Sequence, residues 1–198
     1  MKSEKAYPQD LHIHTTYSHG DSSVAAEQTV DLVAAIAHAE IMGISDHFEF
    51  VATDAFTAYE NDLRRNGMKV GVEVDGHAWV GDAASSPVDY YIFHCRDHRE
   101  DYRSVDILLQ TGKPVIIAHP NALATRLERL PPECLIEINN RYVWRNDWYA
   151  FYQPFIECFR FVISSDAHQP NWLGQSAARY AARILGVTEH LVFPEVQG

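Results

Sequence analysis

The sequence predicts an α/β protein of a single domain, residues 1–198, folded as a small, distorted (β/α)7 barrel of the TIM-like type. Three observations support this prediction: seven short strand-like runs, helical patterns between them, and no repeat or linker that would divide the chain. Alternating strands and helices imply parallel pairing through right-handed crossovers. Seven parallel strands can also form a doubly wound open sheet, which remains the alternative.

The expected strands are short runs rich in β-branched, aromatic and other apolar residues. Several are nearly continuous apolar runs, as expected of strands that are covered on both faces. In chain order they are Asp10–His14, Gly43–His47, Val70–Val74, Tyr90–His94, Val115–His119, Leu135–Asn139 and Phe161–Ser165.

Helical patterns separate these strands, and most end at a Gly or Pro stop signal. The expected helices are Val24–Glu40, Ala55–Arg65, Arg99–Gln110, Ala122–Leu130, Trp148–Cys158 and Gln175–Leu185. The segment Gly76–Pro87 lacks a helical period, which predicts a loop as the third connection.

Composition narrows the classes of function. A net charge of −11 disfavours binding to nucleic-acid backbones, although metal ions can still attract a small phosphorylated substrate. The chain has no apolar run of membrane-spanning length and no apolar stretch behind its first lysines, so we expect neither a membrane span nor a secretory signal. Three cysteines without metal-site spacing favour reduced thiols and a cytoplasmic location.

Eleven histidines are the compositional anomaly, and most of them lie at expected strand ends. His12 and His14 are two residues apart, which places both side chains on one face of a strand. The nine candidate metal ligands are the residues at or just after strand ends: His12, His14, His19, His47, Glu73, His94, His119, Asp166 and His168.

The ends of parallel barrel strands meet at one rim, so these nine residues are expected to converge there. Neutral imidazole and carboxylate groups suit zinc, manganese and iron, which predicts bound divalent ions. A lone histidine at a strand end would be ordinary, but nine candidate ligands at equivalent positions are not. The remaining four histidines, His38, His77, His98 and His190, lack this placement and are expected not to be ligands.

Several short segments resemble motifs of the PHP (polymerase and histidinol phosphatase) family, in particular of its small stand-alone metal-dependent phosphoesterases. They occur in the family's order from Asp10 to about Gly174: Asp10–Thr15 (DLHIHT), Ser45–His47 (SDH), Gly71–Glu73 (GVE), Ala118–Pro120 (AHP), Glu137–Asn140 (EINN) and Ser164–His168 (SSDAH). One departure is Ser18-His19-Gly20, where the family often has Ser-Asp-Gly.

The resemblance implies up to three divalent metal ions (Zn, Mn or Fe) and phosphomonoester hydrolysis by a metal-bridged hydroxide, with Glu73 and Asp166 in the catalytic centre. The first metal would take His12, His14, Glu73 and Asp166. The second would share Glu73 and take His94 and His119. The third would take His19, His47 and His168.

Phosphate binding requires a cation near the rim, and the candidates are Arg96, Arg141 and Arg145. Asp10 and Asp46 can orient imidazoles or serve in ordinary turns. Aromatic residues Tyr142, Trp144 and Trp148 can form a substrate wall or belong to the core. Other functions stay open: a phosphodiesterase or nuclease of the same fold, an amide or lactone hydrolase, and a non-catalytic metal-binding module.

Overall fold

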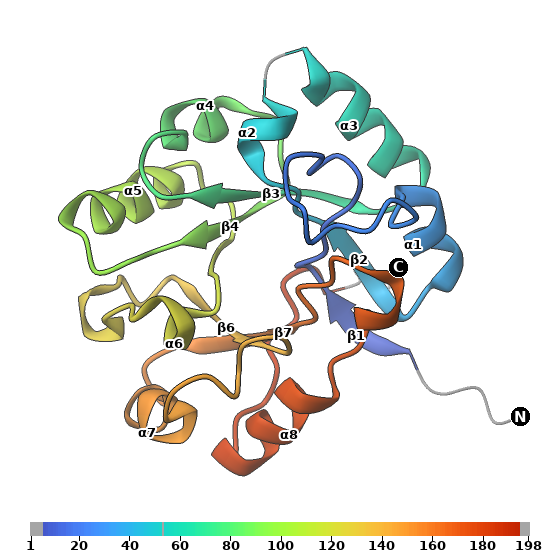
Figure 1. Ribbon diagram of the computed structural model, residues 1–198. Helices are drawn as coiled ribbons and strands as arrows, with labels where there is room; N and C mark the ends of the chain where they lie inside the picture. The colour runs from blue at the N-terminus through green and yellow to red at the C-terminus, as the bar shows by residue number, and fades with distance from the viewer. Residues whose placement is uncertain (1–5, 53, 195–198) are drawn as a thin grey trace, which may run out of the picture.

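Seven parallel strands pair in chain order, from β1 to β7, in the computed structural model, which describes residues 6–52 and 54–194. Helices surround the strands on the outside, as Figure 1 shows in a view along the barrel. The strands are β1 Tyr7–Asp10, β2 Ala39–Ile44, β3 Lys69–Asp75, β4 Tyr90–His94, β5 Val115–Ile117, β6 Leu135–Asn139 and β7 Arg160–Ser164.

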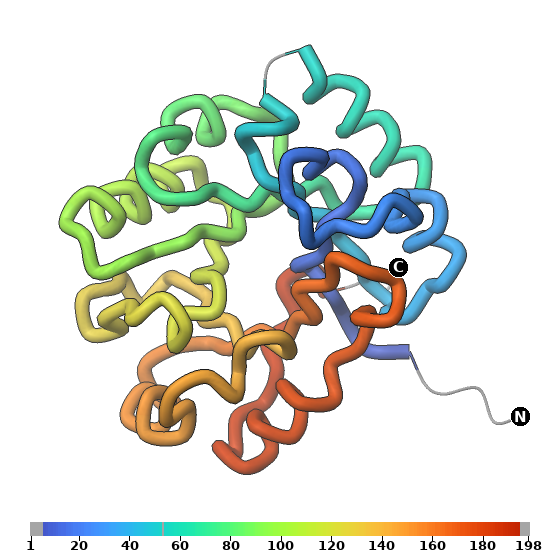
Figure 2. Tube along the Cα trace, in the orientation of Figure 1, coloured from blue at the N-terminus to red at the C-terminus, as the bar shows by residue number. Residues whose placement is uncertain are grey.

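The last strand returns to the first, which makes the sheet a nearly closed barrel. The contact forms just beyond the two strands, where the Asp166 amide donates to the His12 carbonyl at 2.8 Å and the His14 amide to the Ala167 carbonyl at 2.9 Å. In the tube view the blue first segment runs beside the red segment that follows β7 (Figure 2). The predicted (β/α)7 barrel is therefore confirmed, and the doubly wound alternative is wrong.

Eight helices and three 3-10 turns connect the described strands. They are α1 Val30–Ile36, α2 Phe48–Val51, α3 Ala55–Arg65, α4 Val80–Ser85, α5 Arg99–Gln110, α6 Pro120–Leu123, α7 Trp148–Tyr152 and α8 Ser176–Leu185, with the turns at Leu127–Arg129, Gln153–Phe155 and Pro170–Trp172. None of these helices has the length and apolar character needed to span a membrane.

The predictions for α3, α5, β4 and β6 match the structure to the residue, and others need correction. The expected first helix, Val24–Glu40, is helical only over Val30–Ile36. The preceding segment is held instead by tertiary bonds, such as that from the Ala25 amide to the His168 carbonyl at 2.9 Å. Thr29 then caps α1 through its side chain, and Ala37 ends it in a left-handed conformation.

Other boundaries also differ. β1 ends at Asp10, so His12 and His14 lie beyond the strand rather than in it. The expected loop Gly76–Pro87 contains the short helix α4, and the expected helices Ala122–Leu130 and Trp148–Cys158 each break into a single turn followed by a 3-10 turn.

Side chains alternate between the barrel interior and the helical layer, as the period of a strand requires. In β4, Tyr91 and Phe93 belong to the large outer core, whereas Tyr90 and Ile92 belong to a smaller inner cluster. The next inward position in β4 is His94, at the carboxyl end of the strand. The alternation that fills the barrel thus also aims residues at the rim.

Candidate metal centre

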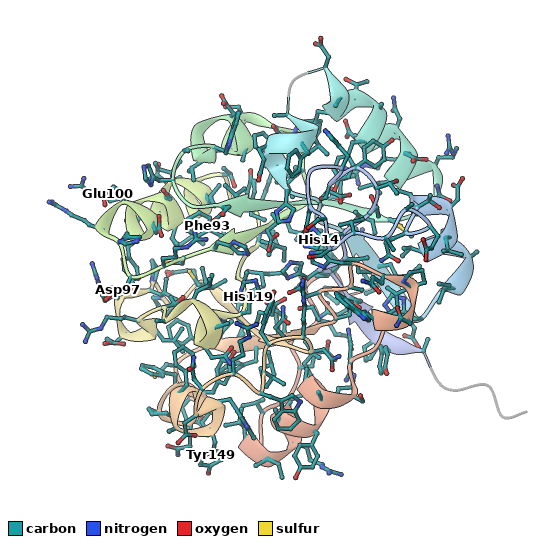
Figure 3. The ribbon with its side chains drawn as sticks, in the orientation of Figure 1. His14, Phe93, Asp97, Glu100, His119 and Tyr149 are labelled. Carbon is teal, nitrogen blue, oxygen red and sulfur yellow. The ribbon has the colours of Figure 1, made fainter. Side chains whose placement is uncertain are left out.

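Eight of the nine predicted ligands lie together at the carboxyl ends of the strands. In Figure 3, His14 and His119 lie near the centre of the ring of helices, whereas Glu100 and Tyr149 lie at its periphery. Three sets of side chains each offer ligand atoms within 4.8 Å of one another: His12, His14 and Glu73; Glu73, His94 and His119; and His14, His47 and His168.

Glu73 is the carboxylate shared by two of these sets. Its Oε1 lies 2.9 Å from Nε2 of His12 and 2.6 Å from Nε2 of His94. Its Oε2 lies 3.0 Å from Nδ1 of His47 and 3.4 Å from Nε2 of His14. Each oxygen therefore faces two imidazoles, so this carboxylate could contribute a ligand atom to both sets.

Asp166 completes the first set. Its Oδ1 lies 3.7 Å from Nε2 of both His12 and His14, whose own Nε2 atoms are 3.1 Å apart. The spacing of two residues thus brings both imidazoles to one point, as predicted, although the residues lie past the strand end.

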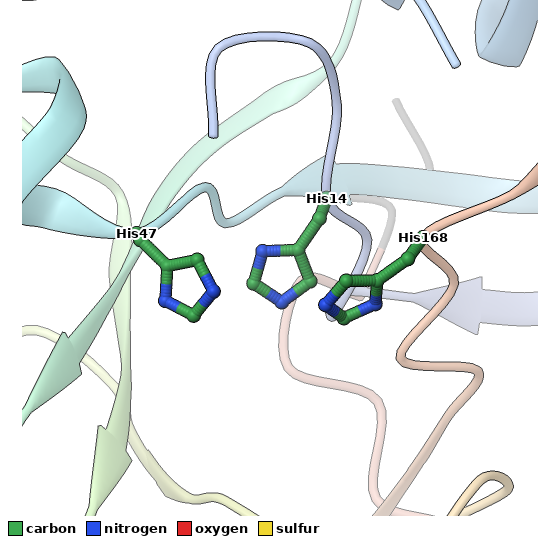
Figure 4. A group of neighbouring side chains, drawn as sticks. All are labelled: His14, His47 and His168. Carbon is green, nitrogen blue, oxygen red and sulfur yellow. The ribbon is translucent and has the colours of Figure 1, made fainter. Parts of the chain in front are cut away.

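The third set differs from the prediction. The rings of His47 and His168 flank His14 at centroid distances of 4.6 and 4.1 Å (Figure 4). Asp21 joins them, with Oδ2 3.0 Å from Nε2 of His168 and 3.4 Å from Nε2 of His47.

His19 is not part of this set. It is exposed, its Nδ1 lies 3.2 Å from the Tyr17 carbonyl, and its ring packs beside Phe50. The turn that carries the Ser18 amide back to Thr15 and the Asp21 amide back to Ser18 directs Asp21, rather than His19, inward. The structure therefore does not bring His19 together with the other predicted ligands.

A buried carboxylate that was not predicted as a site residue, Glu137, supports the cluster from β6. Nδ1 of His12 donates to its Oε1 at 2.7 Å, and the His119 amide donates to its Oε2 at 2.6 Å. The first bond keeps a proton on Nδ1, so Nε2, which faces Glu73, is the nitrogen that could bind a metal ion. An acid at an inward position of an otherwise apolar strand was the sequence signal for this role.

Two of the ligand positions have strained backbones. His119 has a φ of 26° and Asp166 a φ of 55°, a region that residues other than glycine rarely adopt. Hydrogen bonds from their amides to Glu137 and to the His12 carbonyl hold these conformations. Strain of this kind persists where surrounding contacts enforce it, and it clusters at functional sites.

Adjacent imidazoles in the cluster are driven to opposite protonation states. Burial lowers the pKa of His94, but the Glu73 and Asp75 carboxylates together raise it to about 10. Burial lowers the pKa of His119 to about 3, and the neighbouring charge of His94 contributes. The carboxylates therefore attract positive charge, but protons on neighbouring rings repel one another.

The donor atoms fit divalent cations. Five of the ten buried side-chain polar atoms that lack a hydrogen-bond partner in the described residues belong to His14, His47, His94 and His119. Nε2 of His94 is one of them, because its short contact with Glu73 lacks hydrogen-bonding geometry. Buried polar atoms without partners are rare, and nitrogen and carboxylate oxygen together suit zinc, manganese or iron.

A cavity of about 290 Å³ opens over the cluster. Its lining includes Glu73, Asp166, Arg141, Tyr142 and Arg145. The Arg141 guanidinium lies 3.2 Å from Nδ1 of His168 and 3.8 Å from Oδ1 of Asp166, so this predicted phosphate ligand is well placed. A larger cavity, of about 740 Å³, lies at the opposite end of the barrel and contains none of the candidate ligands.

Arg96 does not reach this cavity. Its side chain pairs with Asp75, which is level with His94 in the pairing of β3 with β4, and its amide donates to Asp101. The structure therefore does not bring Arg96 to the cavity, because its guanidinium pairs with a neighbouring carboxylate.

The supporting roles predicted from sequence are only partly present. Asp10 contacts His38, which is not a ligand, at 2.8 Å, and Asp46 accepts hydrogen bonds from Thr15 and Ser18 rather than from an imidazole. Tyr142 lines the cavity, whereas Trp144 and Trp148 do not.

Comparison with protein families found no matching family model, and no curated protein matches the chain. One solved structure with a similar backbone is a truncated form of 3-deoxy-D-arabino-heptulosonate 7-phosphate synthase from Thermotoga maritima. It is 12% identical, with a TM-score of 0.49 over 94% of this chain and 76% of that one.

Proposed function

We propose that this protein is a metal-dependent phosphomonoesterase of the PHP type, with up to three divalent ions at the carboxyl rim of the barrel. The observation that carries the proposal is the position of Glu73, whose two oxygens face four imidazoles that belong to three adjoining ligand sets. Sites that hydrolyse phosphate esters commonly use such paired ions.

Each of these ions would be held by a different set of residues. His12, His14, Glu73 and Asp166 would hold the first, Glu73, His94 and His119 the second, and His14 or Asp21 with His47 and His168 the third. Bound ions would supply Lewis acidity and lower the pKa of a water molecule toward neutrality. Glu137 keeps the His12 proton on Nδ1 and so keeps the opposite nitrogen available as a ligand.

Binding of the substrate phosphate would fall to Arg141, which lines the cavity. Arg141 lies with its guanidinium carbon 5.0 Å from the ring centres of both Tyr142 and Trp172, which fixes its direction. A guanidinium in this position would bind phosphate oxygens and stabilise charge that develops on them. The cavity of about 290 Å³ suits a small phosphorylated molecule better than a polymer.

The test is release of inorganic phosphate from a panel of phosphomonoesters by metal-loaded protein. Glu73→Gln should reduce turnover by on the order of 100-fold or more, because one bridging oxygen becomes an amide nitrogen. Glu157→Gln, an exposed carboxylate away from the cavity, is the matched control. Turnover of Glu73→Gln near that of the control would refute the proposal, and exclusive cleavage of bis(p-nitrophenyl) phosphate would favour a phosphodiesterase.

A further inference from the structure

Arg145 is a second cation of the same cavity, and the proposed chemistry does not use it. Among residues 6–52 and 54–194, no carboxylate lies within ion-pairing distance of its guanidinium. Other arginines of the chain, such as Arg64, Arg96 and Arg129, each pair with an aspartate. An unpaired guanidinium at the edge of a cavity is available to a ligand.

The segment that carries Arg145 is held in place by side-chain hydrogen bonds. Nδ2 of Asn121, a buried residue in α6, donates to the Tyr142 and Arg145 carbonyls, each at 3.0 Å. Asn146, with a φ of 58°, returns a hydrogen bond from its Nδ2 to the Asn121 carbonyl at 2.8 Å. These hydrogen bonds therefore fix the backbone that carries the Arg145 side chain.

Both arginines of the cavity lie over the ring of Tyr142. The guanidinium carbon of Arg145 lies 4.9 Å from its centre, and that of Arg141 lies 5.0 Å from it. The His119 ring lies 4.7 Å from the same centre. Arg141 also contacts His168 and Asp166, whereas Arg145 contacts none of the candidate ligands in the described structure. One cation thus lies beside the metal centre and the other at the cavity's outer edge.

We propose that Arg145 binds a second anionic group of the substrate, a carboxylate or a phosphate, while the first phosphate lies at the metal centre. This inference rests on the proposed function and specifies its substrate class as small phosphomonoesters with a second anion. A guanidinium and an anion form charge-assisted hydrogen bonds, which should improve binding by on the order of tenfold or more.

The experiment measures binding of three non-hydrolysable ligands to the metal-loaded protein by calorimetry. They are propylphosphonate, 3-phosphonopropanoate and propane-1,3-bisphosphonate, which share a short carbon chain but end in a methyl, a carboxylate and a phosphonate group. Elemental analysis after binding checks that the metals stay in place. The variants are Arg145→Gln and the matched control Arg103→Gln, which removes an exposed arginine from α5.

We expect at least one of the two ligands that carry a second anionic group to bind about tenfold or more tightly than propylphosphonate. That advantage should disappear in Arg145→Gln and persist in Arg103→Gln, and the ligand that shows it identifies the second anion as carboxylate or phosphate. Equal binding of all three ligands, or an equal loss for all three in Arg145→Gln, would overturn the inference but leave the phosphate site intact. Failure of all three to bind would refute the phosphate site and the inference together.

Discussion

Substitution of Glu137 by glutamine tests how the buried carboxylate organises the metal centre. Its two oxygens accept four hydrogen bonds, from His12 Nδ1 and the Ser164 hydroxyl on one side and from the His119 amide and Asn139 Nδ2 on the other. A glutamine offers one oxygen only. Its NH2 group must therefore face a pair of donors in either orientation.

Each orientation has a cost that follows from these contacts. If the NH2 group faces His12, the imidazole proton must move to Nε2, the nitrogen that faces Glu73. If it faces the His119 amide, that buried donor is left without a partner. Loss of one charge-assisted hydrogen bond costs about 1.5–3 kcal/mol. Loss of a partner that orients a ligand typically weakens metal binding by about 10–100-fold.

The pKa of Glu137 also indicates how much this carboxylate contributes to the free energy of unfolding. Burial raises this pKa, but the charge and hydrogen bond of His12 lower it from its usual 4.5 to about 2. That depression corresponds to roughly 3 kcal/mol of stability in the metal-free protein near neutral pH. Because the folded-state value is the lower one, this stability is present above pH 4.5 and is lost as the pH falls toward 2.

The assay has two parts. Competition with a chromophoric chelator measures zinc affinity, which should fall about 10–100-fold in Glu137→Gln. Urea unfolding of the metal-free proteins should show a loss of about 2–3 kcal/mol at pH 7 that shrinks as the pH falls below 4.5. Glu133→Gln, an exposed acid just before β6, should change neither quantity. Wild-type zinc affinity in Glu137→Gln would refute the proposed role of this carboxylate.

Two further predictions concern the third ligand set and the barrel interior. Asp21→Ala should weaken the binding of one metal ion per chain, whereas His19→Ala should not, because of these two residues only Asp21 contacts His47 and His168. Elemental analysis of the dialysed proteins measures the number of bound ions. Loss of an ion in His19→Ala but not in Asp21→Ala would identify His19 as the ligand. Gly71→Ala should lower unfolding free energy by about 1–3 kcal/mol, because its Cβ would lie 2.2 Å from Cζ of Tyr90, whose hydroxyl is fixed by the Leu11 carbonyl. The control is Gly81→Ala in α4, where the added Cβ would meet open space, and its free energy of unfolding in urea should not fall. Equal unfolding free energies for the two variants would contradict the close packing at Gly71.

Much of the site was predictable because strand ends obey simple geometry. Parallel strands place their carboxyl ends at one rim, so Glu73, His94 and His119 converge whatever the details of their loops. Each follows a nearly continuous apolar run that could be recognised without knowledge of tertiary contacts. These positions therefore depend on local pattern and topology alone.

The errors lie where tertiary contacts override local pattern. The choice between His19 and Asp21 depends on a turn set by backbone hydrogen bonds to Thr15 and Ser18, which spacing does not reveal. Arg96 was expected at the phosphate, but the aspartate beside it in the neighbouring strand engages it. The length of α1 likewise depends on the hydrogen bond from the Ala25 amide to the loop after β7.

The measurement that tests the central claim most directly is phosphate release during stepwise metal addition to the metal-free protein. If the rim cluster is a phosphomonoesterase centre, hydrolysis should rise with metal occupancy and stop rising at two to three ions per chain, the capacity of the three ligand sets. Full occupancy of these ligands without hydrolysis of any phosphomonoester on a broad panel would contradict it.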